Sequence, residues 1–169
     1  MSTCSPDLVA LPTNSILLVS PCIEDHVSLE SIFRGSRWNL VGACTASDGL
    51  RIIHRHHSKI PVVICEHRLP DGDWKLVLGE MDKAEDPPSL IVCSRLADER
   101  LWVEVLNFGA FDLLLSAPFV PEEVLRVTES AWSARNRTAR PMAVPRKAPE
   151  DALSLPHSGQ SALAAGSRI

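Results

Sequence analysis

Residues 61–74, PVVICEHRLPDGDW, decide the fold of this chain. The stretch starts as a short apolar run rich in branched side chains, and Pro70, Asp71 and Gly72 then end it with turn-forming residues. Such a run is typical of a strand that is buried on both faces at the centre of a parallel sheet. Glu66 is the last residue of that strand, at the edge where open α/β sheets place ligands and chemistry. Glu66 is therefore the first candidate site residue.

Four other apolar runs predict strands, and each predicted strand is followed by a segment with helical spacing of its apolar residues. The strands start about every 22 to 28 residues, as expected for strand–helix units with right-handed crossovers. This pattern predicts a three-layer α/β sandwich, in which helices cover both faces of a five-stranded parallel sheet. The five predicted strands are Ser15–Ser20, Trp38–Cys44, Pro61–Glu66, Ser89–Ser94 and Phe111–Leu115.

The distribution of charge divides the chain of 169 residues into three parts. Residues 15–134 form the predicted folded domain, and residues 1–14 are interpreted as a flexible lead-in. Residues 135–169 carry 6 Lys and Arg against 2 Asp and Glu, whereas residues 1–134 carry 11 against 19. The last 35 residues hold four prolines and no aromatic residue, so they cannot bury enough apolar surface to offset the entropy of ordering. We predict a disordered tail there.

Several classes of function are disfavoured by the sequence. No apolar run approaches the roughly 20 residues of a membrane helix, so we expect a cytoplasmic protein without membrane contact. The five cysteines form no CxxC pair, which indicates reduced thiols. His54 and His57 lack further ligands at metal-binding spacing, so no metal site is predicted. The basic tail has neither interleaved aromatic residues nor a reading helix, so nucleic-acid binding is not expected.

Four segments, taken in order, resemble a known family. SILLVS, VVICEHRLPDGDW, LIVCSR and GAFDLLLSAPFVPEEV together resemble the receiver domain of two-component response regulators, over about residues 15–132. The most specific pieces are RLPDGD after the third strand and GAFD with PFVPEEV around the fifth. The resemblance implies a flavodoxin-like sheet with strand order 2-1-3-4-5.

The resemblance also implies where a phosphorylation site would be. Receivers accept a phosphoryl group on an aspartate that ends the third strand. An acidic pair after the first strand holds Mg²⁺, a Ser or Thr ends the fourth strand, and a Lys precedes a proline after the fifth. In this chain Glu66 takes the phosphoacceptor position, Ser20 and Pro21 replace the acidic pair, Ser94 keeps the hydroxyl, and Ala117 replaces the lysine.

These replacements predict that the phosphorylation chemistry is lost. Ser20 and Pro21 supply no negative charge, so Mg²⁺ would have Glu66 almost alone as a ligand, and we predict that Mg²⁺ binding is lost. Without the metal and the lysine, the oxygens of a transferred phosphoryl group are not neutralised. Glu66 is also one methylene longer than aspartate, which displaces its oxygens from the geometry of in-line attack.

Two interpretations of Glu66 remain open. Its carboxylate can imitate a phosphorylated aspartate and extend a negative charge toward Ser94. The alternative is a partly exposed carboxylate at a strand end, paired with Arg68 or Arg95. Arg95 is the preferred partner because it follows Ser94 directly and because a guanidinium can bind a carboxylate with two hydrogen bonds.

The function predicted from the resemblance is a stand-alone, atypical receiver domain that acts as a phosphorylation-independent protein-interaction module. No enzyme activity is predicted. The expected partner is a protein of a signalling pathway, such as a histidine kinase or another regulator. In receivers the usual docking face is formed by the fourth helix, the fifth strand and the fifth helix. The candidate docking residues on this side are Trp102, Phe119, Val120 and Trp132.

Two alternative functions are kept. The first is a phosphorelay receiver with a rearranged site, in which Glu24 or Asp25 substitutes for the missing acidic pair. It predicts measurable Mg²⁺ binding. The second is a small-ligand sensor that uses the vacated pocket, and it predicts thermal stabilisation by a metabolite. That pocket would be bounded by Ser20, Glu66, Ser94 and Ala117.

Overall fold

Three buried strands form the centre of the molecule. The structure is a computed structural model that describes residues 11–139. Every residue of β1 (Ser15–Val19) and β3 (Val62–Glu66) is buried, and β6 (Ser89–Ser94) is buried after its first residue. Continuous apolar runs of this kind are stable only where both faces of a sheet are covered. The strand expected at residues 61–66 is therefore confirmed, and Glu66 is its last residue.

The main sheet has five parallel strands in the order β2-β1-β3-β6-β7, with β2 at Asn39–Ala43 and β7 at Asp112–Leu115. Counted along the main sheet alone, this is the predicted order 2-1-3-4-5. The register pairs Glu66 with Cys93 and Cys93 with Leu114, so the carboxyl ends of the central strands meet at one edge.

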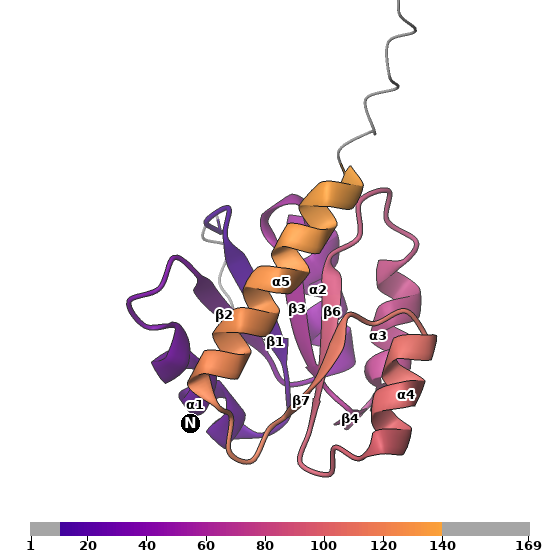
Figure 1. The fold of residues 1–169 in the computed structure, drawn as a ribbon. Coiled ribbons are helices and arrows are strands. Elements are labelled where there is room, and N and C mark those ends of the chain that lie inside the picture. The colour runs from indigo at the N-terminus through magenta and orange to yellow at the C-terminus, as the bar shows by residue number, and fades with distance from the viewer. Residues whose placement is uncertain (1–10, 140–169) are drawn as a thin grey trace, which may run out of the picture.

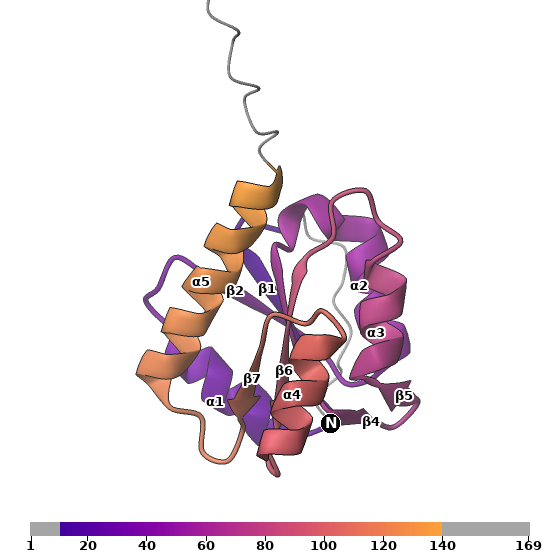
Figure 2. The same cartoon turned by 45° about the vertical axis from the view of Figure 1, so that its right-hand side comes forward.

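Helices cover both faces of the sheet, as Figures 1 and 2 show. On one face lie α1 (Ile23–Phe33) and α5 (Pro121–Ala139). On the other lie α2 (Ala46–His56), α3 (Trp74–Met81) and α4 (Glu99–Asn107). Each face has its own apolar core, so the predicted three-layer arrangement with five helices is confirmed.

Side-chain caps fix where three of these helices begin. Thr45 accepts a hydrogen bond from the Asp48 N–H at the start of α2, and Asp98 accepts one from the Leu101 N–H at the start of α4. Asp73 caps α3 in the same way. Each cap satisfies a backbone donor that has no partner inside the helix. The cap of α4 matters for the site, because it sets the position of the loop that follows β6.

A small hairpin between β3 and α3 was not predicted. It consists of β4 (Arg68–Leu69) and β5 (Gly72–Asp73), which pair antiparallel. At its tip, Asp71 accepts hydrogen bonds from the backbone of Ala46 and from Ser47. These bonds lower the pKa of Asp71 and tie the hairpin to the start of α2. The turn-forming residues after Glu66 therefore make a structured connection.

The predicted domain boundaries need correction at both ends. Helix α5 continues to Ala139, five residues beyond the boundary expected at 134. Arg135 holds its last turns by donating to the Pro87 carbonyl and pairing with Asp86 at 2.5 Å. Within the predicted lead-in, Leu11 packs on the core and the Ser15 hydroxyl donates to the Pro12 carbonyl. Residues 1–10 and 140–169, which hold the rest of the predicted lead-in and tail, lie outside the described residues.

Neither a membrane span nor a metal cluster is found within residues 11–139. No helix there combines the length and the apolar character needed to cross a bilayer. No group of three or more His, Cys, Asp or Glu side chains gathers there with the geometry to hold a metal ion. His54 lies in the last turn of α2, and His57 begins a short 3₁₀ turn (His57–Lys59).

Candidate functional site

The carboxyl edge of the sheet brings together three of the five predicted site positions. Ser20, Glu66 and Ser94 follow or end β1, β3 and β6, and all three are buried. Pro21 and Ala117 are exposed and contribute no polar side chain. The parallel register explains the result, because strands that pair residue for residue also end side by side.

Asp25, a residue of the first turn of α1, brings a buried carboxylate to the Ser20 hydroxyl and to Arg95. Its side chain is 2% exposed. The Ser20 hydroxyl donates to Asp25 Oδ2 at 2.6 Å, and Arg95 Nη2 donates to Asp25 Oδ1 at 3.1 Å. Both carboxylate oxygens therefore have a partner, and one partner carries a full positive charge. Glu24, the other residue considered as a substitute, is exposed and accepts a hydrogen bond from the Cys22 thiol.

Arg95 is paired with Asp25 and not with Glu66, so the predicted Glu66–Arg95 ion pair is wrong. Arg95 follows the end of β6, and its guanidinium also donates to Cys22 Sγ at 2.6 Å. The nearby negative charge of Asp25 is the main reason why the pKa of Arg95 is raised. The sequence placed Arg95 at the correct edge but could not show that α1 supplies a better-positioned carboxylate.

Glu66 is the least satisfied polar group of the site. It is 8% exposed, and within residues 11–139 its side chain accepts only a weak hydrogen bond from the Cys93 thiol, 3.8 Å from Oε2. Burial raises the pKa of Glu66, the negative charge of Asp25 raises it further, and Arg95 partly offsets both. A buried carboxylate that lacks a close cation is costly, because the protein replaces little of its hydration.

Ser94 keeps the predicted hydroxyl but directs it toward its own loop. Ser94 Oγ accepts a hydrogen bond from the Leu96 N–H at 3.2 Å. Among the described residues it forms no hydrogen bond with Glu66. The structure therefore holds Glu66 and Ser94 at the same edge without the direct contact that phosphate mimicry would use.

A cavity of about 450 Å³ opens beside Glu66. It lies between the β3–β4 connection, the β6–α4 loop and the first turns of α4. Ser20 and Ala117, which were expected to bound the vacated pocket, do not line it. The cavity is therefore shifted toward α4 from the predicted place. Its lining includes Glu66, Arg68, Ser94, Leu96, Arg100 and Leu101.

The residues present do not fit the Mg²⁺ ion of receiver domains. Mg²⁺ needs hard oxygen ligands in an octahedral arrangement and binds through one or two carboxylates. Both oxygens of Asp25 are already bound, one of them by the guanidinium of Arg95. Arg95 thus places a positive charge beside the carboxylates that would have to hold the metal. No reaction step through Mg²⁺ follows from this arrangement.

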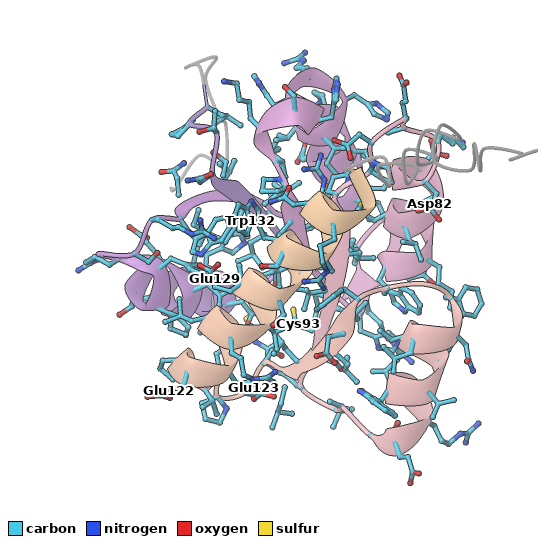
Figure 3. The ribbon with its side chains drawn as sticks, turned by 45° about the horizontal axis from the view of Figure 1, so that its top comes forward. Asp82, Cys93, Glu122, Glu123, Glu129 and Trp132 are labelled. Atoms are coloured by element: carbon cyan, nitrogen blue, oxygen red, sulfur yellow. The ribbon has the colours of Figure 1, made fainter. Side chains whose placement is uncertain are left out.

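The four candidate docking residues separate into two groups. Trp102 on α4 and Val120 before α5 are each 47% exposed. Phe119 is 7% exposed and belongs to the core under α5. Trp132 packs against that core, with its ring edge-on to Trp38 at 6.2 Å between ring centroids. Figure 3 shows Trp132 on the side of α5 that faces α1 and β2. Phe119 is therefore part of the core, and Trp132 is partly buried against it.

The cysteines of the central strands are buried and unreactive. Burial raises the pKa of the Cys65 and Cys93 thiols far above the ordinary value. A thiol reacts through its thiolate, so neither side chain is poised for redox chemistry. Cys93 instead supplies the weak donor that contacts Glu66. The sequence could have indicated this contact only through the strand register.

Comparison with known proteins gives structural relatives only. No family profile matches the chain, and no curated protein matches it. Many solved structures do match. A signal receiver domain from Vibrio parahaemolyticus is 20% identical, with a TM-score of 0.67, and the match covers 77% of this chain and 96% of that one. A response regulator receiver domain protein from Clostridium thermocellum is 18% identical, with a TM-score of 0.66 and coverage of 73% and 98%.

A third similar structure comes from a complex that contains BeF3 and Mg²⁺. It is a chain of the CheX–CheY–BeF3–Mg²⁺ complex from Borrelia burgdorferi, 21% identical, with a TM-score of 0.62 and coverage of 69% and 87%. At these identities the likeness concerns the fold. The resemblance inferred from the sequence is thereby confirmed at the level of structure: the chain has the fold of response regulator receiver domains.

Proposed function

We propose that this protein is an atypical receiver-like domain that binds a partner protein of a signalling pathway without being phosphorylated at Glu66. Its structural neighbours are receiver domains, which are signalling modules. The proposed partner is a histidine kinase or another regulator, and the proposed location is the cytoplasm. The domain performs no catalysis of its own, and Mg²⁺ is not a cofactor.

The Asp25–Arg95 ion pair is the observation that carries this proposal. It places a fixed cation of the protein on Asp25, at the edge of the sheet where a receiver would bind its metal. A metal ion would have to displace the guanidinium and then find ligands among Asp25, Glu66 and neutral groups. Phosphoryl transfer without a metal or a lysine leaves the charge on the phosphoryl oxygens unsupported.

Exposed apolar side chains on α4, β7 and the loop before α5 support the choice of a protein partner. Trp102, Val103 and Leu106 project from α4 with exposed fractions of 47%, 45% and 36%. Leu115 of β7 and Val120 are 45% and 47% exposed. Grouped apolar side chains on a protein surface mark contact sites more often than chance. Aromatic residues such as Trp102 contribute strongly to binding energy in interfaces.

Backbone amide NMR tests the absence of phosphorylation. Spectra of the full chain are recorded with and without Mg²⁺ and beryllofluoride, which mimics a bound phosphoryl group. We expect the two spectra to coincide. Shifts centred on Glu66 and Ser94 that spread into α4 would sink the proposal and restore a phosphorylated receiver.

Binding to partner candidates tests the interaction role. Wild-type protein and Trp102→Ala are compared against the histidine kinases and regulators of the same cell. We expect one of them to bind wild type and to bind Trp102→Ala at least about tenfold more weakly. Leu76→Ala is the matched control, because Leu76 is 43% exposed on α3 and is not one of the proposed contact residues. Equal loss in both variants would contradict the assignment of the surface.

A phosphorelay receiver with a rearranged site is the second candidate function. The burial of Asp25 beside Glu66 favours it, because one of the two carboxylates lost from the sequence positions is restored in space. The pairing of Asp25 with Arg95 opposes it. The NMR experiment separates the two candidates, since only the rearranged receiver responds to Mg²⁺ and beryllofluoride.

A further inference from the structure

The cavity beside Glu66 has the size of a small-molecule site. Its volume is about 450 Å³, within the range of ligand pockets in proteins. Residues of the β3–β4 connection, the β6–α4 loop and α4 line it together. We call it the Glu66 cavity. Its lining includes Glu66, Arg68, Ser94, Leu96, Arg100 and Leu101, and also Arg95 and the carboxylates of Asp98 and Glu104.

The inner wall of the Glu66 cavity presents a carboxylate that forms no ion pair within residues 11–139, although Arg95 lines the same cavity. Glu66 is buried, with 8% of its surface exposed, and the Cys93 thiol lies 3.8 Å from its Oε2 atom. The nearby guanidinium of Arg95 is held by Asp25 at 3.1 Å. Native proteins rarely leave a buried charged group so weakly bound, and such a group calls for a specific explanation. A ligand that donates hydrogen bonds from a cationic nitrogen would supply the missing partner.

The outer part of the Glu66 cavity carries two arginines without partners. Arg68 begins β4, and Arg100 lies in the first turn of α4. Both line the cavity and are exposed, and neither side chain forms a hydrogen bond or an ion pair within residues 11–139. Leu96 and Leu101 provide apolar surface in the same cavity. Two guanidinium groups at one opening suit a carboxylate or another small oxyanion.

We propose that the Glu66 cavity binds a small zwitterion of the amino-acid type, whose cationic amino group pairs with Glu66 and whose carboxylate pairs with Arg68 and Arg100. A simple cation is disfavoured because it would have to pass the two arginines. A simple anion is disfavoured because it would leave Glu66 unpaired and would approach its negative charge. Apolar methylene groups between the two charged ends would contact Leu96 and Leu101. This inference goes beyond the proposed protein contact and does not depend on it.

A series of ω-amino acids tests the ligand class. Glycine, β-alanine, 4-aminobutyrate and 6-aminohexanoate differ only in the spacing of their two charges. Each is titrated at millimolar concentrations into the full chain, and the melting temperature and the amide NMR spectrum are followed. At least one member should raise the melting temperature with concentration and shift the amides of Glu66, Leu96 and Arg100. Butylamine and butyrate, which carry one charge each, should produce no such shift.

Substitutions then assign the contacts. Glu66→Gln and the double variant Arg68→Gln/Arg100→Gln should each weaken binding of the best ω-amino acid by about tenfold or more. Arg55→Gln is the matched control, because Arg55 is an exposed arginine of α2 outside the cavity. Glu66→Gln keeps the shape of the side chain and removes only its charge, so loss of folding is not expected.

Three results would overturn the proposal: no response to any ω-amino acid, equal binding of butylamine or butyrate, or undiminished binding to Glu66→Gln. The ω-amino acid titrations contain neither Mg²⁺ nor beryllofluoride, so they are independent of the earlier NMR test. A response to Mg²⁺ and beryllofluoride in that earlier test would contradict the proposed phosphorylation-independent function and would leave the ligand result standing. Conversely, failure of every ω-amino acid would leave the protein-interaction role intact.

Discussion

Arg95 donates a hydrogen bond to the buried carboxylate of Asp25 across 3.1 Å, and this pair joins the end of β6 to the first turn of α1. The two residues are 70 positions apart in the sequence. Asp25 is almost fully buried, whereas the Arg95 side chain is 44% exposed. The pair therefore acts as a bridge that covers a buried charge from the solvent side.

Removal of the bridge should destabilise the domain. In Arg95→Gln, Asp25 stays buried and keeps only the hydrogen bond from the Ser20 hydroxyl. We expect a loss of about 2 kcal/mol in the free energy of unfolding, because breaking a buried pair leaves one charge uncompensated. Urea denaturation at neutral pH measures the change. Arg55→Gln, an exposed arginine of α2, should change the same free energy by less than about 0.5 kcal/mol.

A second substitution tests the cause of that loss. Asp25→Asn removes the buried charge, so adding it to Arg95→Gln should restore part of the lost stability. The two changes should then be strongly non-additive, as expected for residues in direct contact. Additive losses would mean that Arg95 stabilises the domain through contacts other than Asp25.

The single substitution Arg95→Gln should also create a divalent-cation site. Without Arg95, the carboxylates of Asp25 and Glu66 lie near each other with no guanidinium at either one. Hard cations prefer oxygen ligands of this kind. We expect Mn²⁺ to broaden the amide signals around Asp25 and Glu66 in Arg95→Gln, and to leave the wild-type spectrum unchanged at the same concentration. Broadening that persists in Asp25→Asn/Arg95→Gln would show that the ion binds elsewhere.

The sequence predicted the sheet well because its signal is local. Each central strand is a continuous apolar run, and the turn formers after Glu66 mark where the strand stops. The edge position of Ser20, Glu66 and Ser94 follows from these strands alone, because parallel strands end together.

The partners within the site could not be predicted in the same way. Whether Arg95 meets Glu66 or Asp25 depends on how α1 leaves β1, and no spacing in the sequence encodes that angle. The packing of Trp132 against the core likewise depends on which side of α5 turns toward α1. The helical spacing of Trp132 was compatible with a core position and with a docking position. Only the packing against Trp38 decides between them.

Two helical glycines should respond in opposite directions to alanine. A Cβ at Gly49 of α2 would lie 2.7 Å from Val19 Cγ2, and Val19 is a stiff, fully buried residue of β1. Gly49→Ala should therefore lower the free energy of unfolding by about 1–2 kcal/mol, despite the better helix propensity of alanine.

Gly79 of α3 is exposed, and a Cβ there meets no atom within 4 Å. Gly79→Ala should raise the same free energy by about 0.5–1 kcal/mol. Thermal and urea unfolding measure both changes, and destabilisation by both variants would contradict the packing described for Gly49.

Glu66 should make stability depend on pH in a direction opposite to that of a salt-bridged carboxylate. Burial and Asp25 raise its folded-state pKa above the ordinary value of 4.5. Between these two pKa values the folded protein holds a proton that the unfolded chain has released, so stability falls as the pH rises through the interval. Glu66→Gln cannot ionise, so near pH 7 it should be more stable than wild type by about 1 kcal/mol, and below about pH 4 the difference should vanish. Urea unfolding between about pH 4 and pH 7 measures the stability difference between wild type and Glu66→Gln. The control is Glu122→Gln, because Glu122 is an exposed carboxylate of α5. Equal stability of wild type and Glu66→Gln at every pH would mean that Glu66 has a compensating partner in solution.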